Sequence, residues 1–132
     1  MSKIGVENTI HASVRLGRNV TIGNYCEIYE DVVIGSNVVI GDNVIIRYNS
    51  VIGCQSKIKD NVIIKSNCII GQDVVIGENS VINDSVLIAL GVRIRGNSDI
   101  GAHSLIGYSA IVYNGSNISE MSIIGVRESV SN

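Results

Sequence analysis

The sequence predicts an all-β fold, a parallel β-helix, on three observations. Stepping by six from Ile4, every residue reached up to Ile124 is Ile, Leu or Val, which gives 21 aliphatic positions in one unbroken frame. Four residues after each comes a second column of small residues, Val, Cys, Ser or Ala, and only Asn8 and Glu128 at its two ends break it. Phe, Trp and Pro are absent, so the core must be built from small, regular pieces. This periodicity is typical of a solenoid.

Each six-residue unit is expected to form one short strand and one corner. Residues two apart share a face of a strand, so the small residue and the aliphatic residue two positions later both point inward. The residues between them, often Gly-X-Asn or Gly-Asp-Asn, suit a turn because Gly and Asn tolerate positive φ. One unit cannot bury its own face, so the units are expected to stack into a coil around a continuous core.

Charge and composition exclude several classes of partner. The net charge is −2 and the basic residues form no run or stripe, which argues against binding to nucleic acid. The opening MSKIGVENTI lacks the pattern of a secretory signal, and no apolar run approaches the ~18 residues of a membrane span. We therefore expect a cytoplasmic protein with no nucleic-acid or membrane partner. Cys26, Cys54 and Cys68 have no metal-ligand spacing and are expected to be reduced thiols.

Three segments carry a family resemblance. They are residues 85–94 (SVLIALGVRI), 100–112 (IGAHSLIGYSAIV) and 118–127 (ISEMSIIGVR). They resemble the VWIGAGVxI, IGAGAVIGAGSVV and IPENSIVAGNPAK segments of the hexapeptide-repeat acyltransferases, in particular the sugar O- and N-acetyltransferases. The resemblance covers about residues 76–130. It implies a left-handed triangular prism with 18 residues per turn, hence about seven coils in a single domain over residues 1–132, here without a lid insertion.

A corner for the acyl donor follows from the same resemblance. Ala89, Gly107 and Gly125 are each 18 residues apart and should stack. In the family, backbone amides and small residues at such a corner hold the pantetheine arm of acyl-CoA between subunits. This implies that the three residues and Ser109 bind acetyl-CoA, and that Arg127 meets a CoA phosphate. The alternative is that the glycines serve only the turn.

The family's catalytic His is missing from its usual place, two units before the unit of Ile88. Glu78 lies in that segment instead, and Leu87 replaces the usual Trp. Glu78, Asp60 and Asp42 are each 18 apart, which predicts an acidic ladder in which neighbouring charges make Glu78 a usable base. The alternative is that these are solvated acids in Asp-Asn turns.

The two histidines do not supply a metal centre. His11 and His103 are expected at the same corner class but five coils apart, some ~24 Å, so they cannot ligate one metal within a subunit. The γ-type carbonic anhydrases resemble this fold but need three His on zinc. We therefore expect no metal.

One outward column is apolar for most of its length. An exposed column of this length favours a subunit interface, and the resemblance implies a homotrimer. The alternative is ordinary β-propensity on an exposed sheet. The column contains Val33, Val51, Ile69, Leu87, Leu105 and Ile123.

The leading functional expectation is an acyl-CoA-dependent transferase, with acetyl-CoA as donor. Its acceptor would be an amino sugar or nucleotide-linked sugar for surface polysaccharide. An amine suits the missing His, because it already carries the attacking lone pair and loses its proton after attack. Two alternatives stay open. One is a non-catalytic structural or assembly β-helix that has lost the catalytic His. The other is a domain whose catalytic partner lies elsewhere, as in sugar-nucleotide pyrophosphorylases with a C-terminal β-helix.

Overall fold

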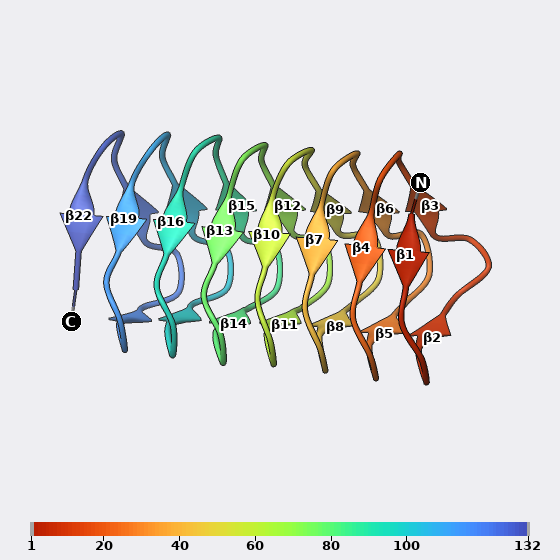
Figure 1. Ribbon diagram of the computed structural model, residues 1–132. Coiled ribbons are helices and arrows are strands. Elements are labelled where there is room, and N and C mark those ends of the chain that lie inside the picture. Colours follow the sequence, from red (N-terminus) through yellow and green to blue (C-terminus); the bar gives the residue numbers. More distant parts are fainter. Residues whose placement is uncertain (1, 132) are drawn as a thin grey trace.

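The computed structural model describes residues 2–131, which form two-residue strands joined by tight corners (Figure 1). The strands lie in three parallel sheets, named A, B and C. Sheet A contains β1 (Lys3–Ile4), β4 (Thr21–Ile22), β7 (Val39–Ile40), β10 (Lys57–Ile58), β13 (Val75–Ile76), β16 (Arg93–Ile94), β19 (Ile111–Val112) and β22 (Ser129–Val130). Sheet B contains β2 (Thr9–Ile10), β5 (Glu27–Ile28), β8 (Ile45–Ile46), β11 (Ile63–Ile64), β14 (Val81–Ile82), β17 (Asp99–Ile100) and β20 (Asn117–Ile118). Sheet C contains β3 (Arg15–Leu16), β6 (Val33–Ile34), β9 (Val51–Ile52), β12 (Ile69–Ile70), β15 (Leu87–Ile88), β18 (Leu105–Ile106) and β21 (Ile123–Ile124).

The strand register repeats every 18 residues. Ile64 of β11 lies opposite Ile46 of β8 on one side and Ile82 of β14 on the other. The same offset holds in all three sheets, so residues 2–131 contain no inserted loop. Figure 1 shows the resulting prism, with the two ends of the chain at opposite ends of the axis. The predicted left-handed parallel β-helix of about seven coils is confirmed. Residues 2–131 contain no helix, and therefore none that could cross a membrane.

Both predicted inward columns form the core. From Ile22 to Ile106, every aliphatic residue of the six-residue frame is 2% exposed or less. Most of the small column is buried beside it, and several of its serines, such as Ser50, Ser56 and Ser80, form hydrogen bonds between coils. The Ser56 hydroxyl donates to the Gly71 carbonyl at 2.9 Å and accepts the Val74 N–H at 3.1 Å. These two bonds satisfy a hydroxyl and an amide that would otherwise be buried without partners, which explains why Ser is tolerated inside.

The corners are of three kinds. Corner I joins sheet C to sheet A, corner II joins A to B, and corner III joins B to C. The third residue of a corner has positive φ at every described corner except that of Ser13. Asn79 (φ 62°) and Gly91 (φ 77°) are examples. This explains the Asn residues of the repeat, since Asn adopts the left-handed region at low cost. Among the described glycines only Gly91 and Gly115 have positive φ, so the predicted reason for Gly is wrong at most corners. A first-position glycine such as Gly107 is needed because a Cβ there would collide with the next coil.

Candidate functional site

Ala89, Gly107 and Gly125 stack at corner I, directly after β15, β18 and β21. A Cβ added to Gly107 would lie 2.8 Å from the carbonyl carbon of Gly125 and 2.8 Å from the nitrogen of Val126. One coil earlier, a Cβ on Gly71 would lie 2.9 Å from the carbonyl carbon of Ala89. Successive backbones therefore touch here, and the spacing argument for this corner is correct. The first position of each turn carries almost no side chain over four coils.

The backbone N–H groups of this corner are already engaged. The Ala89 N–H donates to the Ile106 carbonyl at 2.9 Å, and the Gly107 N–H makes the equivalent bond to the next coil at 2.7 Å. The Gly125 N–H donates to the carboxylate of Glu128. This corrects the expected donor role, because coil stacking itself uses these amides. The backbone groups with spare capacity here are carbonyl oxygens, each with a second lone pair for a ligand N–H.

Ser109 and Arg127 are the third residues of the next two turns of corner I. Both have positive φ, 57° and 60°. The Ser109 N–H donates to the Leu90 carbonyl at 3.0 Å, and the Arg127 N–H donates to the Tyr108 carbonyl at 2.8 Å. No described residue forms a hydrogen bond or ion pair with the Arg127 guanidinium. That cation is thus available to an external anion beside Ala89, Gly107 and Gly125, which together form the small-residue strip.

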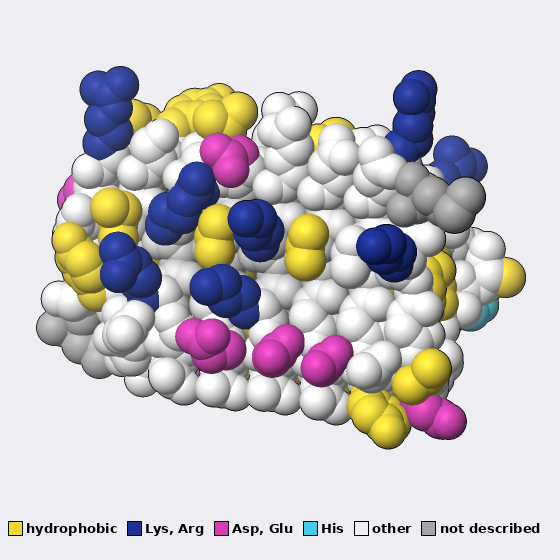
Figure 2. All heavy atoms as spheres, viewed as in Figure 1, with side chains coloured by type: hydrophobic (Ala, Val, Ile, Leu, Met, Phe, Trp, Pro, Cys, Tyr) yellow, Lys and Arg dark blue, Asp and Glu magenta, His cyan; other side chains and the backbone are white. Residues whose placement is uncertain are grey.

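An apolar rim flanks the strip, and sequence reasoning missed it. The second residues of three successive turns, Leu90, Tyr108 and Val126, are 47%, 58% and 61% exposed. Figure 2 shows apolar side chains along the upper edge of the prism toward its C-terminal end. The signal was present in the sequence, since these residues are 18 apart as well. It was overlooked because at corner I only first and third positions were compared, whereas second positions were compared at corner II alone.

The apolar column predicted on sheet C does point outward. Ile69 and Leu105 are 50% and 44% exposed, and Ile123 at the C-terminal end is 77% exposed. Together with the rim on corner I, this column makes one side of the C-terminal coils apolar. Its role as a subunit interface stays a prediction.

Glu78 lies at corner II, after β13, and Ala89 lies at corner I. The width of sheet A separates the two corners, so a single chain does not bring the candidate base to the candidate donor site. The two belong to one site only if different subunits contribute them.

The acidic ladder on corner II is built differently from the expectation. The Asp42 carboxylate accepts the Asn24 N–H at 2.8 Å, and the Asp60 carboxylate accepts the Asp42 N–H at 2.8 Å. These carboxylates therefore act as hydrogen-bond acceptors for the backbone of the preceding coil. Glu78, the last member of the ladder, is exposed. It lines two neighbouring hollows on the face of sheet A, one shared with Lys57, Lys59 and Asp60 and the other with Lys59, Arg93 and Arg95.

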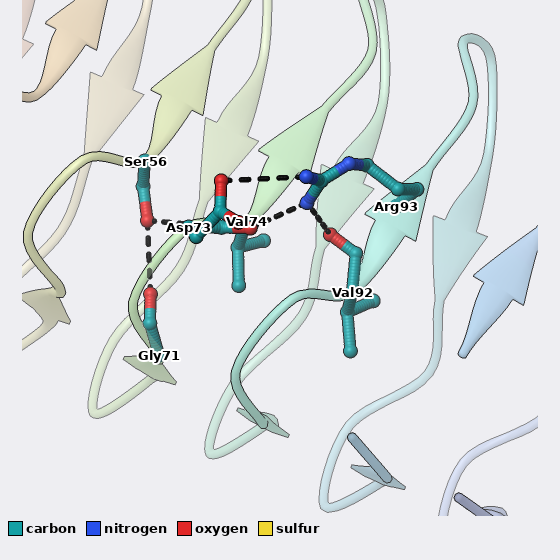
Figure 3. Close-up of polar contacts among 6 residues, drawn as sticks. All are labelled: Ser56, Gly71, Asp73, Val74, Val92 and Arg93. Atoms are coloured by element: carbon teal, nitrogen blue, oxygen red, sulfur yellow. Dashed lines mark hydrogen bonds and ion pairs between the residues drawn. The ribbon is translucent and has the colours of Figure 1, made fainter. Parts of the chain in front are cut away.

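Arg93 is held in place across the face of sheet A. Its guanidinium reaches from β16 to Asp73 at corner I, contacts the Asp73 carboxylate at 3.3 Å and donates to the Asp73 backbone carbonyl (Figure 3). It also donates to the carbonyl of Val92 at 3.3 Å. No pattern in the sequence predicts this pair, because the two residues are not related by the 18-residue repeat.

The histidines are separate, as expected. The His11 ring Nδ1 lies 2.8 Å from the Ser13 hydroxyl, at the one described corner without positive φ. His103 occupies a positive-φ position five coils further along, also on corner III. Residues 2–131 hold no group of three His, Cys, Asp or Glu side chains placed to bind a metal.

The cysteines are free thiols within the described chain. Cys26 and Cys68 are core residues whose sulfur atoms donate to backbone carbonyls of the next coil, at 3.1 and 3.0 Å. Burial raises the pKa of both thiols above the ordinary value. Both are packing residues of the core.

Solved structures with this fold include several sugar-modifying enzymes. The fold is similar to that of UDP-N-acetylglucosamine O-acyltransferase (LpxA) from Moraxella catarrhalis, with a TM-score of 0.76 and 19% identity over 98% of this chain and 65% of that one. It is also similar to the acetyltransferase domain of PglB from Neisseria gonorrhoeae, solved with acetyl coenzyme A (TM-score 0.62, 16% identity, 99% of this chain and 54% of that one). A third is perosamine N-acetyltransferase from Caulobacter crescentus, solved with CoA and GDP-perosamine (TM-score 0.54, 20% identity, 89% and 52%).

The chain thus has the fold of the hexapeptide-repeat acyltransferases, as the three segments predicted, and it spans between half and two thirds of the length of these structures. No curated protein matches the sequence. A protein family does match, over residues 1–91, which is more than half of the chain. The chain belongs to the family of the GMPPB C-terminal domain.

Proposed function

We propose that this chain transfers an acyl group from acyl-CoA, with acetyl-CoA as the donor, to an amino sugar or nucleotide-linked sugar. The observation that carries the proposal is the strip of corner I, where Ala89, Gly107 and Gly125 carry little or no side chain on the coils that lead to the unpaired cation of Arg127. A pantetheine arm needs such an edge, because its amides must approach the backbone closely. The methylene groups of the pantetheine arm can pack on the exposed apolar rim of Leu90, Tyr108 and Val126.

The site would be completed by a second copy of the chain. We propose a homotrimer packed through the apolar column of sheet C, acting in the cytoplasm, with residues 1–132 as one β-helix domain. In such an assembly corner I of one subunit can face corner II of its neighbour. Glu78 of the neighbour is then the base that the single chain lacks at the donor site.

The reaction is an ordinary acyl transfer. The lone pair of the acceptor amine attacks the thioester carbonyl and forms a C–N bond. The C–S bond then breaks, and coenzyme A leaves as the thiolate. The proton released by the amine passes to the Glu78 carboxylate or to water, which is why an amine tolerates the missing His.

The test is calorimetric binding of acetyl-CoA to the unmodified chain and to Ala89→Trp. Ala89 is the suitable position because it already has a Cβ, whereas a side chain on Gly107 would collide with the next backbone. The indole should fill the strip and remove binding. Ser119→Trp is the matched control, since Ser119 is an exposed first corner residue at corner III. Equal acetyl-CoA binding by both variants would place the donor elsewhere, and no binding at millimolar concentration would end the enzyme proposal.

A second candidate is a non-catalytic assembly module. The family match favours it, because the matched family is described as the C-terminal domain of a protein, and it covers the first coils and not the corner of Gly107 and Gly125. On this reading the chain presents its apolar faces to other subunits and binds no acyl donor. The same calorimetry separates the two candidates.

A further inference from the structure

A row of two cations crosses sheet A with an apolar residue between them. Lys57 of β10 and Arg93 of β16 are the register neighbours of Val75 of β13, one coil on each side. All three are outward residues of the sheet. The cations therefore stand two coils, or about 10 Å, apart over an uncharged floor.

A second row repeats this arrangement at corner II. Lys59 and Arg95 are exposed first residues of their turns, and Gly77 occupies the same position on the coil between them. A Cβ on Gly77 would lie 2.4 Å from the nitrogen of Gly96, and both glycines are buried. No side chain can therefore rise between the two cations of this row.

The two rows together form a four-cation frame, defined as Lys57, Lys59, Arg93 and Arg95. The rows are two residues apart along the chain, about 7 Å in an extended strand. Lys59, Arg93 and Arg95 line one hollow together with Val75 and Gly77. Lys57 and Lys59 line the neighbouring hollow, which lies over Val39 and Gly41 of the preceding coil. Figure 2 shows basic side chains on both sides of an apolar one in the middle of this face.

Three carboxylates lie near the frame, and two of them, Asp73 and Asp60, already have partners. Asp73 pairs with Arg93 from the side of corner I, which orients that guanidinium without covering the floor. Asp60 accepts a backbone N–H of the preceding coil. Glu78 lines both hollows, and its Oε1 lies 2.9 Å from the position that a Cβ on Gly96 would take, beside the glycine floor. The four cations of the frame thus outnumber the three carboxylates near them, Asp60, Asp73 and Glu78, and leave this face with an excess of positive charge.

We infer that the four-cation frame binds the diphosphate group of a substrate. Guanidinium groups bind phosphate oxygens bidentately and ammonium groups bind them as point charges, and two linked phosphates give both rows an anionic partner. The glycine floor lets the phosphates come close to the backbone. As a substrate assignment the inference rests on the proposed function: the diphosphate of a nucleotide-linked sugar held here would place its sugar toward Glu78. Coenzyme A also contains a diphosphate, so it is the second source of the same chemistry.

The experiment measures binding at low ionic strength by calorimetry, with inorganic pyrophosphate, UDP and acetyl-CoA as separate probes. The test variant is Lys59→Ala with Arg95→Ala. The matched control is Arg18→Ala with Lys65→Ala, which removes the same charge from corners I and III. Pyrophosphate should bind the test variant roughly tenfold more weakly or worse, as expected for the loss of two charge-assisted contacts, and should bind the control like the unmodified chain.

The remaining probes identify the source. If the test variant loses affinity for UDP as it does for pyrophosphate, and its affinity for acetyl-CoA is unchanged, the frame binds a nucleotide-linked substrate. If acetyl-CoA loses affinity together with pyrophosphate, the frame serves the donor, and the diphosphate assignment still stands. Pyrophosphate that does not bind, or that binds all three proteins equally, overturns the inference. That result leaves acetyl-CoA binding and its loss in Ala89→Trp untouched, so the proposed function is judged separately.

Discussion

Replacing Ile64 with Ala tests the inward column at its centre. Ile64 is completely buried in β11, between Ile46 and Ile82 of the neighbouring coils. The change removes three carbon groups, worth about 2.4 kcal/mol at about 0.8 kcal/mol each. The cavity adds to this, because the coils above and below are fixed by their hydrogen bonds and cannot close over it. We expect a total loss of about 3–4 kcal/mol, within the range of about 2–5 for such substitutions.

The matched control is Ile63→Ala on the same strand. Ile63 is also an isoleucine and directly precedes Ile64 in β11, but its side chain points outward and is only partly buried. It should lose about 1 kcal/mol or less in urea unfolding at the same protein concentration, with an unchanged dependence on denaturant. Equal losses for the two variants would mean that the strand does not present one face to the core, and the reasoning from the six-residue frame would be refuted.

Three further predictions concern assembly, pH and chemistry. Ile69→Arg combined with Leu105→Arg should turn the expected trimer into a monomer in sedimentation analysis, because two charges would have to be buried; a monomeric unmodified chain removes the interface from consideration. Since the pKa of the buried Cys68 thiol is raised in the folded state, its contribution to stability is complete below the unfolded thiol pKa of about 8.5 and is lost as pH rises through the folded value. The urea midpoint should therefore fall above pH 8.5, and less steeply in Cys68→Val; identical slopes contradict the assignment. Glu78→Gln should lower turnover on an amino sugar without changing acetyl-CoA affinity, whereas full turnover would make Glu78 a turn residue only.

The fold could be predicted from the sequence because each six-residue unit of the repeat forms one strand and one corner of the prism. A side chain that recurs every six residues without a slip occupies the same place in each of the three sheets, and residues 18 apart stack on successive coils. Burial of Ile64 and stacking of Gly107 on Gly125 therefore follow from the spacing alone. The spacing did not predict that the N–H groups at corner I are already hydrogen-bonded, because it gives the position of Ala89 and not the partner of its N–H.

Interactions outside the repeat could not be predicted from it. The Arg93–Asp73 pair joins residues 20 apart in sequence, so it depends on side-chain length and direction and not on the period. The stack of Asp42 and Asp60 was identified correctly, but the backbone N–H groups that their carboxylates accept were not, because these bonds depend on side-chain direction. The relation of Glu78 to Ala89 depends on assembly, which a single chain does not specify.

The order of the small-residue strip along the axis has a thermodynamic consequence. In a solenoid each coil gains its stability from the coils beside it, so a coil near an end of the prism opens at lower cost than one in the middle. Ala89, Gly107 and Gly125 lie on three successive coils, and the last of these is the turn that leads into β22. A ligand bound along all three would act as a cross-link between coils that otherwise open one after another. Its binding free energy would appear as slower hydrogen exchange in the terminal coil, with little change in the already protected centre.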